Sequence, residues 1–297
     1  MADFAVPGVG LGHATRAGTG VTVVALPPGT IGAGEVRGGA PASRELALLE
    51  PTRTVIHVDA IVFAGGSAFG LAAADGVVSA LATEGRGVPT SAGPVPIVPA
   101  ACVFDLGGPA EAVPGPDDGA AAFAAARIGG PATAGRIGAG TGTTVGKWRG
   151  RVYAVPGGVG TAARTVDGAT IAAVAVVNAV GDVVGADGRV LAGSTAPAAV
   201  PPFPDPAPFA GRGDTTLVAV VTDAACDKVG CFLLAQSAHD GLARAIVPAH
   251  TRFDGDLAIA AATGVTEVPI DRLRVAATEV TAAAIRAAVA PGPVGAP

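Results

Sequence analysis

A Pro-rich segment at residues 193–214 is the feature that most restricts how this chain can fold. The segment has no apolar periodicity and contains six prolines, so it predicts a flexible or extended connector. Residues 215–222 follow directly and are rich in β-branched side chains, the composition typical of a strand. Any fold must therefore place a strand at the end of an extended connector, with a long block of sequence before it and a shorter block after it.

Apolar runs closed by Gly or Pro predict further elements on both sides of the connector. Residues 170–184, with a turn at 181–182, are expected to pair with residues 143–155. The other predicted strands are residues 21–26, 57–63, 97–106 and 257–263. The predicted helices are residues 71–81, 119–127, 228–247 (with Asp227 as N-cap) and 275–289, followed by a frayed tail at 291–297. Aromatic residues make up only 4% of the chain, so the core must consist of small aliphatic side chains.

Charge and hydropathy exclude several classes of partner. The net charge is −5, and no block of like charge could bind a phosphate backbone, so we expect no nucleic acid partner. The uncharged residues 87–104 contain four prolines and cannot form a membrane-spanning helix. The first residues lack the pattern of a secretory signal, which makes a cytoplasmic location the default expectation. The three cysteines have no metal-type spacing and are expected to be buried thiols.

The common catalytic and nucleotide motifs are not matched. The Gly-rich residues 135–148 have Thr141 where a P-loop requires Gly, and Trp148 where it requires Ser or Thr. Residues 8–13 end in His13 where a dinucleotide fingerprint requires Gly. The sequence has four histidines and no Gly-x-Ser-x-Gly elbow, so a Ser-His-Asp arrangement is hard to assemble. His239 and His250, in and just after a predicted helix, are better explained as core or surface residues.

Thr215 offers another route to an activated hydroxyl. Cleavage of the Asp214–Thr215 bond would give Thr215 a free amine, whose pKa of about 8 makes it a usable base near neutral pH. Asp254-Gly255-Asp256, which precedes a predicted strand, places two carboxylates where they could hold an amine and share a proton. From the residues alone, a structural Thr at a strand start, and an Asp-Gly turn or cation-binding loop, remain the simpler interpretations.

Motifs spread over most of the chain resemble one enzyme family. The sequence is similar to the L-aminopeptidase/D-alanine esterases, β-peptidyl aminopeptidases and nylon-oligomer hydrolases, which are N-terminal-nucleophile-like enzymes. The matching segments are residues 35–41, 44–45, 58–62, 65–71, 74–77, 95–101, 104–106, 140–142, 146–147, 177–182, 222–224 and 238–246.

The resemblance implies a fold, a processing step and an assembly. The fold would be an α+β layered sandwich, a single domain spanning residues 1–297. Self-cleavage between Asp214 and Thr215 would give fragments 1–214 and 215–297, which stay together around one core. Family members assemble as tetramers or larger oligomers, so a homo-oligomer of processed units is expected. No metal or other cofactor is implied.

The resemblance also assigns roles to residues of this chain. Thr215 would be the nucleophile, and Asp254 and Asp256 would orient its amine and pass a proton to the leaving group. Lys147 and Asn178 would be donors that fix the nucleophile and stabilise the oxyanion. Asp214 stands where the nylon-oligomer hydrolases have Asn. The family also has a Tyr in its substrate site, and the position of Tyr153, the only tyrosine of this chain, does not clearly match it.

The family has two branches, which differ in the nucleophile and in the motif that follows it. The aminopeptidase branch has a Ser nucleophile and a Ser-x-Glu pair, whereas the nylon-oligomer branch has Thr and Asp-Gly-Asp. With Thr215 and Asp254-Gly255-Asp256, this chain resembles the nylon-oligomer branch. The expected activity is therefore hydrolysis of short ω-amino acid amides through a Thr acyl-enzyme. The alternatives are an aminopeptidase or esterase acting on small peptides, and an unprocessed, non-enzymatic binding or assembly protein.

Overall fold

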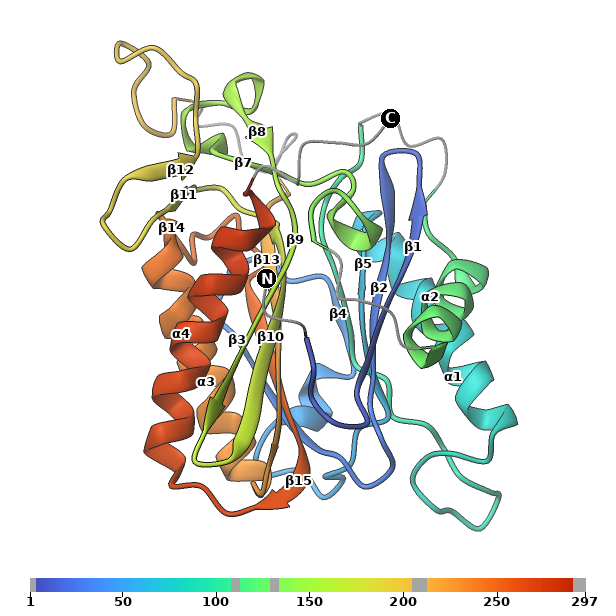
Figure 1. Cartoon of the computed structure of the whole chain (residues 1–297). Coiled ribbons are helices and arrows are strands. Elements are labelled where there is room, and N and C mark those ends of the chain that lie inside the picture. The colour runs from blue at the N-terminus through green and yellow to red at the C-terminus, as the bar shows by residue number, and fades with distance from the viewer. Residues whose placement is uncertain (1–3, 108–112, 129–133, 205–212, 291–297) are drawn as a thin grey trace.

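Two five-stranded sheets lie face to face, with a pair of helices on the outer face of each (Figure 1). The computed structural model describes residues 4–107, 113–128, 134–204 and 213–290. The order β1-β2-β5-β6-β4 makes up sheet A: β1 (Gly10–Arg16), β2 (Thr19–Ala25), β5 (Ala60–Ala64), β6 (Ala100–Cys102) and β4 (Ser43–Arg44). The order β3-β15-β13-β10-β9 makes up sheet B: β3 (Ile31–Val36), β15 (Leu257–Thr266), β13 (Thr215–Ala224), β10 (Ala169–Asn178) and β9 (Gly158–Val166).

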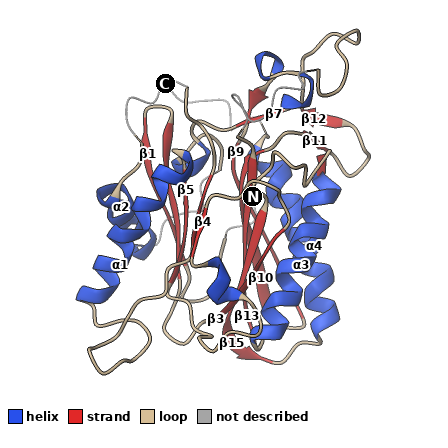
Figure 2. Cartoon of the chain, turned by 180° about the vertical axis from the view of Figure 1, so that it is seen from behind, coloured by secondary structure: helices blue, strands red, loops and turns tan. Residues whose placement is uncertain are grey.

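The helices form the two outer layers, which Figure 2 shows from behind. The pair α1 (Ala73–Thr83) and α2 (Pro116–Ile128) covers sheet A, and the pair α3 (Lys228–Ala245) and α4 (Ile270–Ala288) covers sheet B. Asp227 caps α3, because its Oδ1 accepts a hydrogen bond of 2.7 Å from the Gly230 N–H. The smaller strands are β7 (Thr144–Val145) with β8 (Val155–Pro156), and β11 (Asp182–Val184) between β12 (Val190–Ala192) and β14 (Ile246–Val247). The 3₁₀ turns are Leu46–Leu49, Ser67–Ala72, Gly138–Gly140, Lys147–Arg149 and Arg151–Tyr153.

Three apolar clusters fill the three spaces between these four layers. Strand β13 shows how one strand contributes to two of them. Leu217, Ala219 and Val221 face the cluster between the sheets, whereas Val218 and Val220 face the cluster under α3 and α4. Side chains of successive strand residues point to opposite faces, so a strand buried on both faces must be apolar at nearly every position. This burial explains the apolar sequence, rich in β-branched residues, that follows the connector.

Glycine lets the helices lie close to sheet B. A Cβ added to Gly160 in β9 would lie 2.0 Å from the carbonyl oxygen of Ala284 in α4. The small side chains of the sequence therefore serve close packing between layers.

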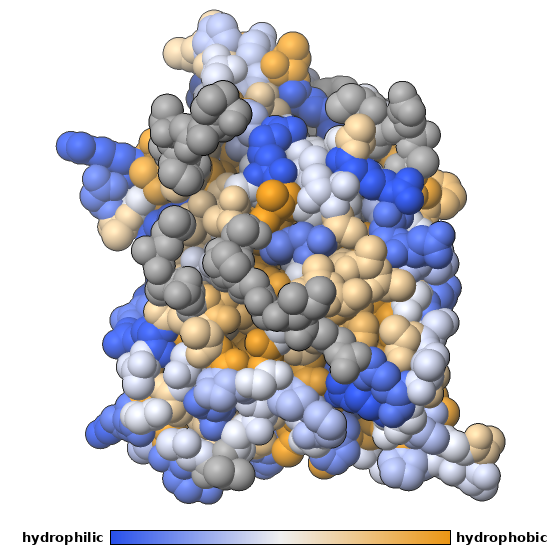
Figure 3. Space-filling view, turned by 45° about the vertical axis from the view of Figure 1, so that its right-hand side comes forward, coloured by the Kyte–Doolittle hydropathy of each residue, from blue (hydrophilic) through white to orange (hydrophobic). Residues whose placement is uncertain are grey.

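On the face in Figure 3, hydrophilic residues surround smaller apolar patches. Among the described residues, no helix is both long and apolar enough to cross a membrane.

Most predicted elements are confirmed, with shifted ends, but the pairing of residues 143–155 with 170–184 is wrong. Residues 143–155 hold only β7, two 3₁₀ turns and the start of β8, because Gly146 and Gly150 take positive φ angles that break a strand. The partners of β10 are β9, which lies in a Gly- and Ala-rich sequence, and β13. The strand predicted at 97–106 shortens to β6, and the helix predicted from residue 275 begins at Ile270.

Residues 193–204 of the connector contain no helix or strand, whereas residues 205–212, like the predicted frayed tail at 291–297, lie outside the described residues. Sheet B joins the two sides of the connector. Strands β3, β9 and β10 precede residue 214, and β13 and β15 follow it. β13 runs antiparallel to β10 and parallel to β15, so the end of β10 and the starts of β13 and β15 meet at one edge of the sheet.

Candidate active site

Thr215 lies at this edge, as the first residue of β13 and opposite Asn178, the last residue of β10. Its side chain is buried, and its Oγ donates a hydrogen bond of 2.5 Å to the Asp214 carbonyl oxygen. The Gly255 N–H donates to the same oxygen at 2.7 Å. A Cβ on Gly255 would lie 2.7 Å from Thr215 Oγ, so this close approach requires glycine. In the continuous chain, the carbonyl of the 214–215 bond therefore accepts two hydrogen bonds beside a buried hydroxyl.

Lys147 and Asn178 lie on one side of this bond. The Lys147 ammonium is 2.6 Å from Asp214 Oδ1 and donates to the Asn178 backbone oxygen at 3.0 Å and to its Oδ1 at 2.9 Å. The Asn178 Nδ2 donates to the carbonyls of Phe104 at 3.1 Å and Gly213 at 3.3 Å. Burial lowers the pKa of Lys147, and the Asp214 carboxylate opposes this shift. Lys147 is thus a buried lysine held by an ion pair with Asp214.

Asp254 and Asp256 lie on the other side and are held mainly by backbone N–H groups. Asp254 Oδ1 accepts from the Val180 N–H at 3.1 Å, and its Oδ2 accepts from Thr251 N at 2.9 Å and Oγ at 2.6 Å. Asp256 Oδ1 accepts from the Thr216 N–H at 2.7 Å. Burial, and then the neighbouring Asp256, raise the pKa of Asp254 to about 7. Asp254 is therefore about half protonated near pH 7.

His250 and Arg151 also belong to the site, although sequence reasoning did not place them there. The His250 backbone N–H and ring Nδ1 both donate to Asp256 Oδ2, at 3.1 and 2.9 Å. Arg151 Nη2 donates to the Gly213 carbonyl at 3.2 Å and lies 3.9 Å from Asp214 Oδ1. The sequence signal for His250 is its position six residues before Asp256, which is too weak to separate it from an ordinary loop histidine.

The structure thus brings Lys147, Asn178, Thr215, Asp254 and Asp256 together around the Asp214–Thr215 bond.

Tyr153 lies in the 3₁₀ turn Arg151–Tyr153, where its backbone oxygen accepts from Thr195 N at 2.9 Å. Among the described residues, no group of three His, Cys, Asp or Glu side chains could hold a metal ion. The thiols are free, with Cys102 and Cys231 buried and Cys226 half-buried.

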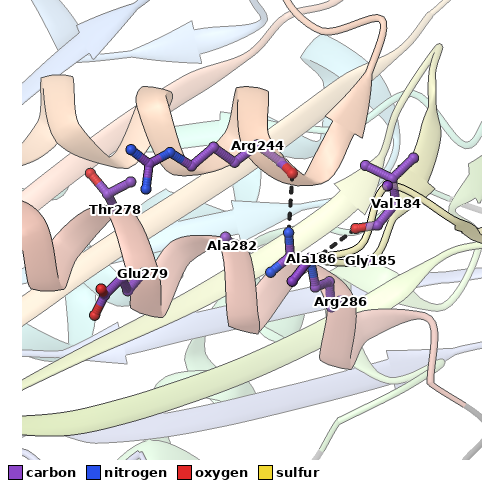
Figure 4. Close-up of a pocket in the computed structure, with 9 residues that line it drawn as sticks. Val184, Gly185, Ala186, Arg244, Thr278, Glu279, Ala282 and Arg286 are labelled. Carbon is purple, nitrogen blue, oxygen red and sulfur yellow. Dashed lines mark hydrogen bonds between the residues drawn. The ribbon is translucent and has the colours of Figure 1, made fainter.

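Two surface pockets lie outside this cluster. One, of about 470 Å³, is lined by Trp148 and Phe203 together with aliphatic residues of β11, β12 and β14. The other, of about 420 Å³, lies between α3, α4 and the turn after β11 (Figure 4). There, Arg286 donates to the carbonyls of Val184 at 2.9 Å and Arg244 at 3.1 Å, so its guanidinium links β11 to α3.

Solved structures share the fold over nearly the whole chain. A β-aminopeptidase from Burkholderia sp. has a TM-score of 0.68 at 24% identity, with 95% of this chain and 84% of that chain covered. The L-aminopeptidase D-Ala-esterase/amidase of Ochrobactrum anthropi, described as a new variant of the Ntn-hydrolase fold, has a TM-score of 0.68 at 19% identity, with the same coverage. The expected layered sandwich of sheets and helices is therefore confirmed, and its structural neighbours are Ntn-hydrolase-like.

Sequence relatives cover most of the chain. An uncharacterized aminopeptidase of Mycobacterium tuberculosis is 45% identical over 267 residues, which is 84% of this chain and 75% of the relative. The 6-aminohexanoate-oligomer endohydrolase of Paenarthrobacter ureafaciens is 33% identical over 285 residues, which is 91% of this chain and 77% of the relative. The model of peptidase family S58 matches residues 3–292. These matches confirm the resemblance found from the motifs: the chain belongs to peptidase family S58.

Proposed function

We propose that this protein is a self-processing amide hydrolase whose nucleophile is Thr215. Membership of a peptidase family supports hydrolysis of amide bonds over a purely binding or assembly role. The observation that carries the proposal is the Asp214–Thr215 bond itself. Its carbonyl oxygen accepts from Gly255 N–H at 2.7 Å, beside the buried Thr215 hydroxyl and between a buried lysine and two carboxyl groups.

Self-cleavage would begin with attack of Thr215 Oγ on the Asp214 carbonyl carbon. The Gly255 N–H stabilises the oxygen as it becomes negative, as a donor in an oxyanion hole does. The C–N bond then breaks, the Thr215 nitrogen takes up the proton that Oγ loses, and Asp214 is held as an ester on Thr215 Oγ. Water hydrolyses the ester, which leaves a carboxylate on Asp214 and a free amine and hydroxyl on Thr215.

Processing would also free donors for a substrate. In the continuous chain, Asn178 Nδ2 donates to the Gly213 carbonyl, and Lys147 is paired with the Asp214 carboxylate. Departure of residues 213 and 214 leaves both donors facing the new amino terminus. A substrate carbonyl that enters this place meets two donors already oriented for the developing oxyanion.

In turnover, the Thr215 amine would take the proton of its own hydroxyl as Oγ attacks the substrate amide. Asp254, whose pKa lies near 7, supplies a proton to the leaving amine, while Asp256 holds the Thr215 amine. Water then hydrolyses the acyl-enzyme and restores both groups.

A denaturing gel of the purified protein tests this proposal. We expect two fragments, the smaller beginning Thr-Thr-Leu-Val, and amidase activity that appears with them. Thr215→Ala should give one uncut band and no activity. A single wild-type band without amidase activity after long incubation would instead support the non-enzymatic alternative.

Two substrate classes have support from different relatives. Thr215 with Asp254-Gly255-Asp256, and the 33% identical 6-aminohexanoate-oligomer endohydrolase, favour short ω-amino acid oligoamides. The 45% identical aminopeptidase favours removal of N-terminal residues from small peptides. An oligomer of 6-aminohexanoate blocked at its amino end separates them. Its hydrolysis supports the endohydrolase activity, whereas reaction of free-amine substrates alone supports the aminopeptidase.

Assembly of processed units into a homo-oligomer is a further part of the proposal. Light scattering on the processed protein would give the subunit number, and a monomer of two fragments would contradict it. Sheet B supports the retention of both fragments, since β13 and β15 lie between β10 and β3.

A further inference from the structure

The Asp256 carboxylate is held from two directions. Its Oδ1 accepts from the Thr216 N–H at 2.7 Å, the amide directly after the nucleophile. Its Oδ2 accepts from the His250 backbone N–H at 3.1 Å and from the His250 ring at 2.9 Å. Two of these donors are backbone groups, and the imidazole is a side chain that adds a third. The ring therefore completes the orientation of a carboxylate that the proposed function places against the Thr215 amine.

The loop that carries His250 has an unusual backbone conformation. His250 has φ of 54°, in the left-handed region that favours Gly and that few other residues adopt. In this conformation its N–H and its ring nitrogen reach the same carboxylate oxygen. The backbone of His250 therefore directs two donors of one residue at Asp256.

A second histidine holds the ring of His250 in place. The His239 ring meets it edge-on, with centroids 4.9 Å apart and planes at 70°. His239 is fully buried in α3, and its Nε2 donates to the Glu35 carbonyl of β3 at 3.0 Å. Burial lowers the pKa of His239 to about 4, so this ring stays neutral and keeps that tautomer at neutral pH. Two residues beyond Glu35, Arg37 N–H donates to the Asp256 backbone oxygen at 3.0 Å.

We propose that His250 is a positioning residue, which acts through Asp256 to orient the Thr215 amine for catalysis. This inference rests on the proposed function and deepens it. The ring N–H fixes the rotation of the carboxylate, so that Asp256 presents an acceptor to the nucleophile's amine rather than turning toward the loop. Outer hydrogen bonds of this kind set the geometry of groups that touch the reacting atoms.

Two substitutions that suit the left-handed backbone test the ring alone. His250→Gly removes the ring without straining the loop, and His250→Asn keeps a side-chain N–H near the place of Nδ1; both keep the backbone N–H. We expect kcat of His250→Gly to fall about tenfold to a hundredfold, as for lost outer partners of catalytic groups, with KM within about twofold. His250→Asn should recover kcat to within about threefold of the wild type. The assay uses linear 6-aminohexanoate oligomers and an aminoacyl p-nitroanilide.

His13→Asn is the matched control, because His13 is another largely buried histidine with one ring hydrogen bond, to Thr22 at 3.0 Å in sheet A. It should leave kcat unchanged whatever it does to the melting temperature. Equal kcat losses in the folded Gly and Asn variants, or a wild-type kcat in His250→Gly, would overturn the inference.

A double-mutant cycle with Asp256→Asn separates positioning from a general structural role. If His250 acts through Asp256, His250→Gly should lower the residual rate of Asp256→Asn by less than about twofold. A full, additive loss would overturn the inference. The proposed function is judged separately, since an uncut and inactive wild type rejects it, whereas an active wild type with an indifferent His250 rejects only the positioning role.

Discussion

The two sides of the Asp214–Thr215 bond are built differently. On one side, Lys147 and Asn178 are satisfied in part by the Asp214 carboxylate and the Gly213 carbonyl. On the other side, Asp254 and Asp256 accept from backbone N–H groups of loops and strands that do not include the connector. Cleavage after residue 214 would therefore change the partners of the first side and leave those of the second in place. Processing would complete the donor side, whereas the carboxylate side is already formed.

Lys147→Met breaks the donor side and should have the largest effect. Methionine leaves the buried Asp214 carboxylate without its cation, and removing one partner of a buried pair destabilises by about 3–5 kcal/mol. It also removes a positive charge beside the Asp214 carbonyl, whose oxygen becomes negatively charged during self-cleavage. We expect self-cleavage to slow more than about a hundredfold, followed on a denaturing gel over time.

Lys228→Met is the control for loss of a buried lysine. The Lys228 ammonium donates to the carbonyls of Leu48, Arg53 and Val55 at 2.7–2.9 Å, at the start of α3. Its loss should lower the melting temperature without changing the cleavage rate of the folded protein. Equal slowing in both variants would mean that Lys147 acts only through stability.

Asp256→Asn tests the carboxylate side, and we expect turnover to fall by about a hundredfold. The amide can present an N–H in place of an acceptor and carries no charge for the Thr215 amine. The measurement is kcat for an amide substrate, with the circular dichroism spectrum as the check on folding. An unchanged kcat in folded protein would remove Asp256 from the machinery.

Some parts of the fold and of the site can be predicted from the sequence, and others cannot. Strand β13 is predicted because it is buried on both faces and so carries a run rich in β-branched residues. Strand β9 escapes prediction because Gly158 and Gly160, which have low β-propensity, allow the close approach of α4. Lys147 and Asn178 are 31 residues apart in the sequence and form a hydrogen bond in the structure. The contact depends on how the turn that carries Lys147 lies against the end of β10, which no local pattern reveals. Only the family resemblance could therefore pair these two residues. His250 has neither periodicity nor motif, and its contact with Asp256 depends on a left-handed turn.

The pH dependence of stability should be moderate and should come from the carboxylate side. The folded-state pKa of Asp254 is raised from 3.8 to about 7, so between these values the folded protein binds more protons at this site than the unfolded chain. Its contribution is therefore favourable at low pH and is lost as pH rises toward 7, by up to about 4 kcal/mol.

Denaturant unfolding at several pH values would measure this effect. Asp254→Asn should have a flatter curve than the wild type from pH 4 to 7, whatever its absolute stability. The same variant should lose the limb near pH 7 in the pH profile of kcat. Parallel stability curves would show that Asp254 titrates alike in the folded and unfolded states.

Asp214→Asn should have the smallest effect, and its sign tests how the donor side works. The substitution introduces Asn, the residue that the resemblance places before the nucleophile in the nylon-oligomer hydrolases. It removes the carboxylate 2.6 Å from Lys147, which opposes the lowering of the lysine's pKa by burial, so less of the lysine stays protonated beside the scissile carbonyl. Less positive charge then stabilises the oxyanion, and self-cleavage should slow by about threefold to tenfold. Time courses of fragment appearance for the two proteins, purified as uncut chains, measure the ratio. Faster cleavage in Asp214→Asn would mean that Lys147 stays protonated without the carboxylate, and that the ion pair holds back the processing step.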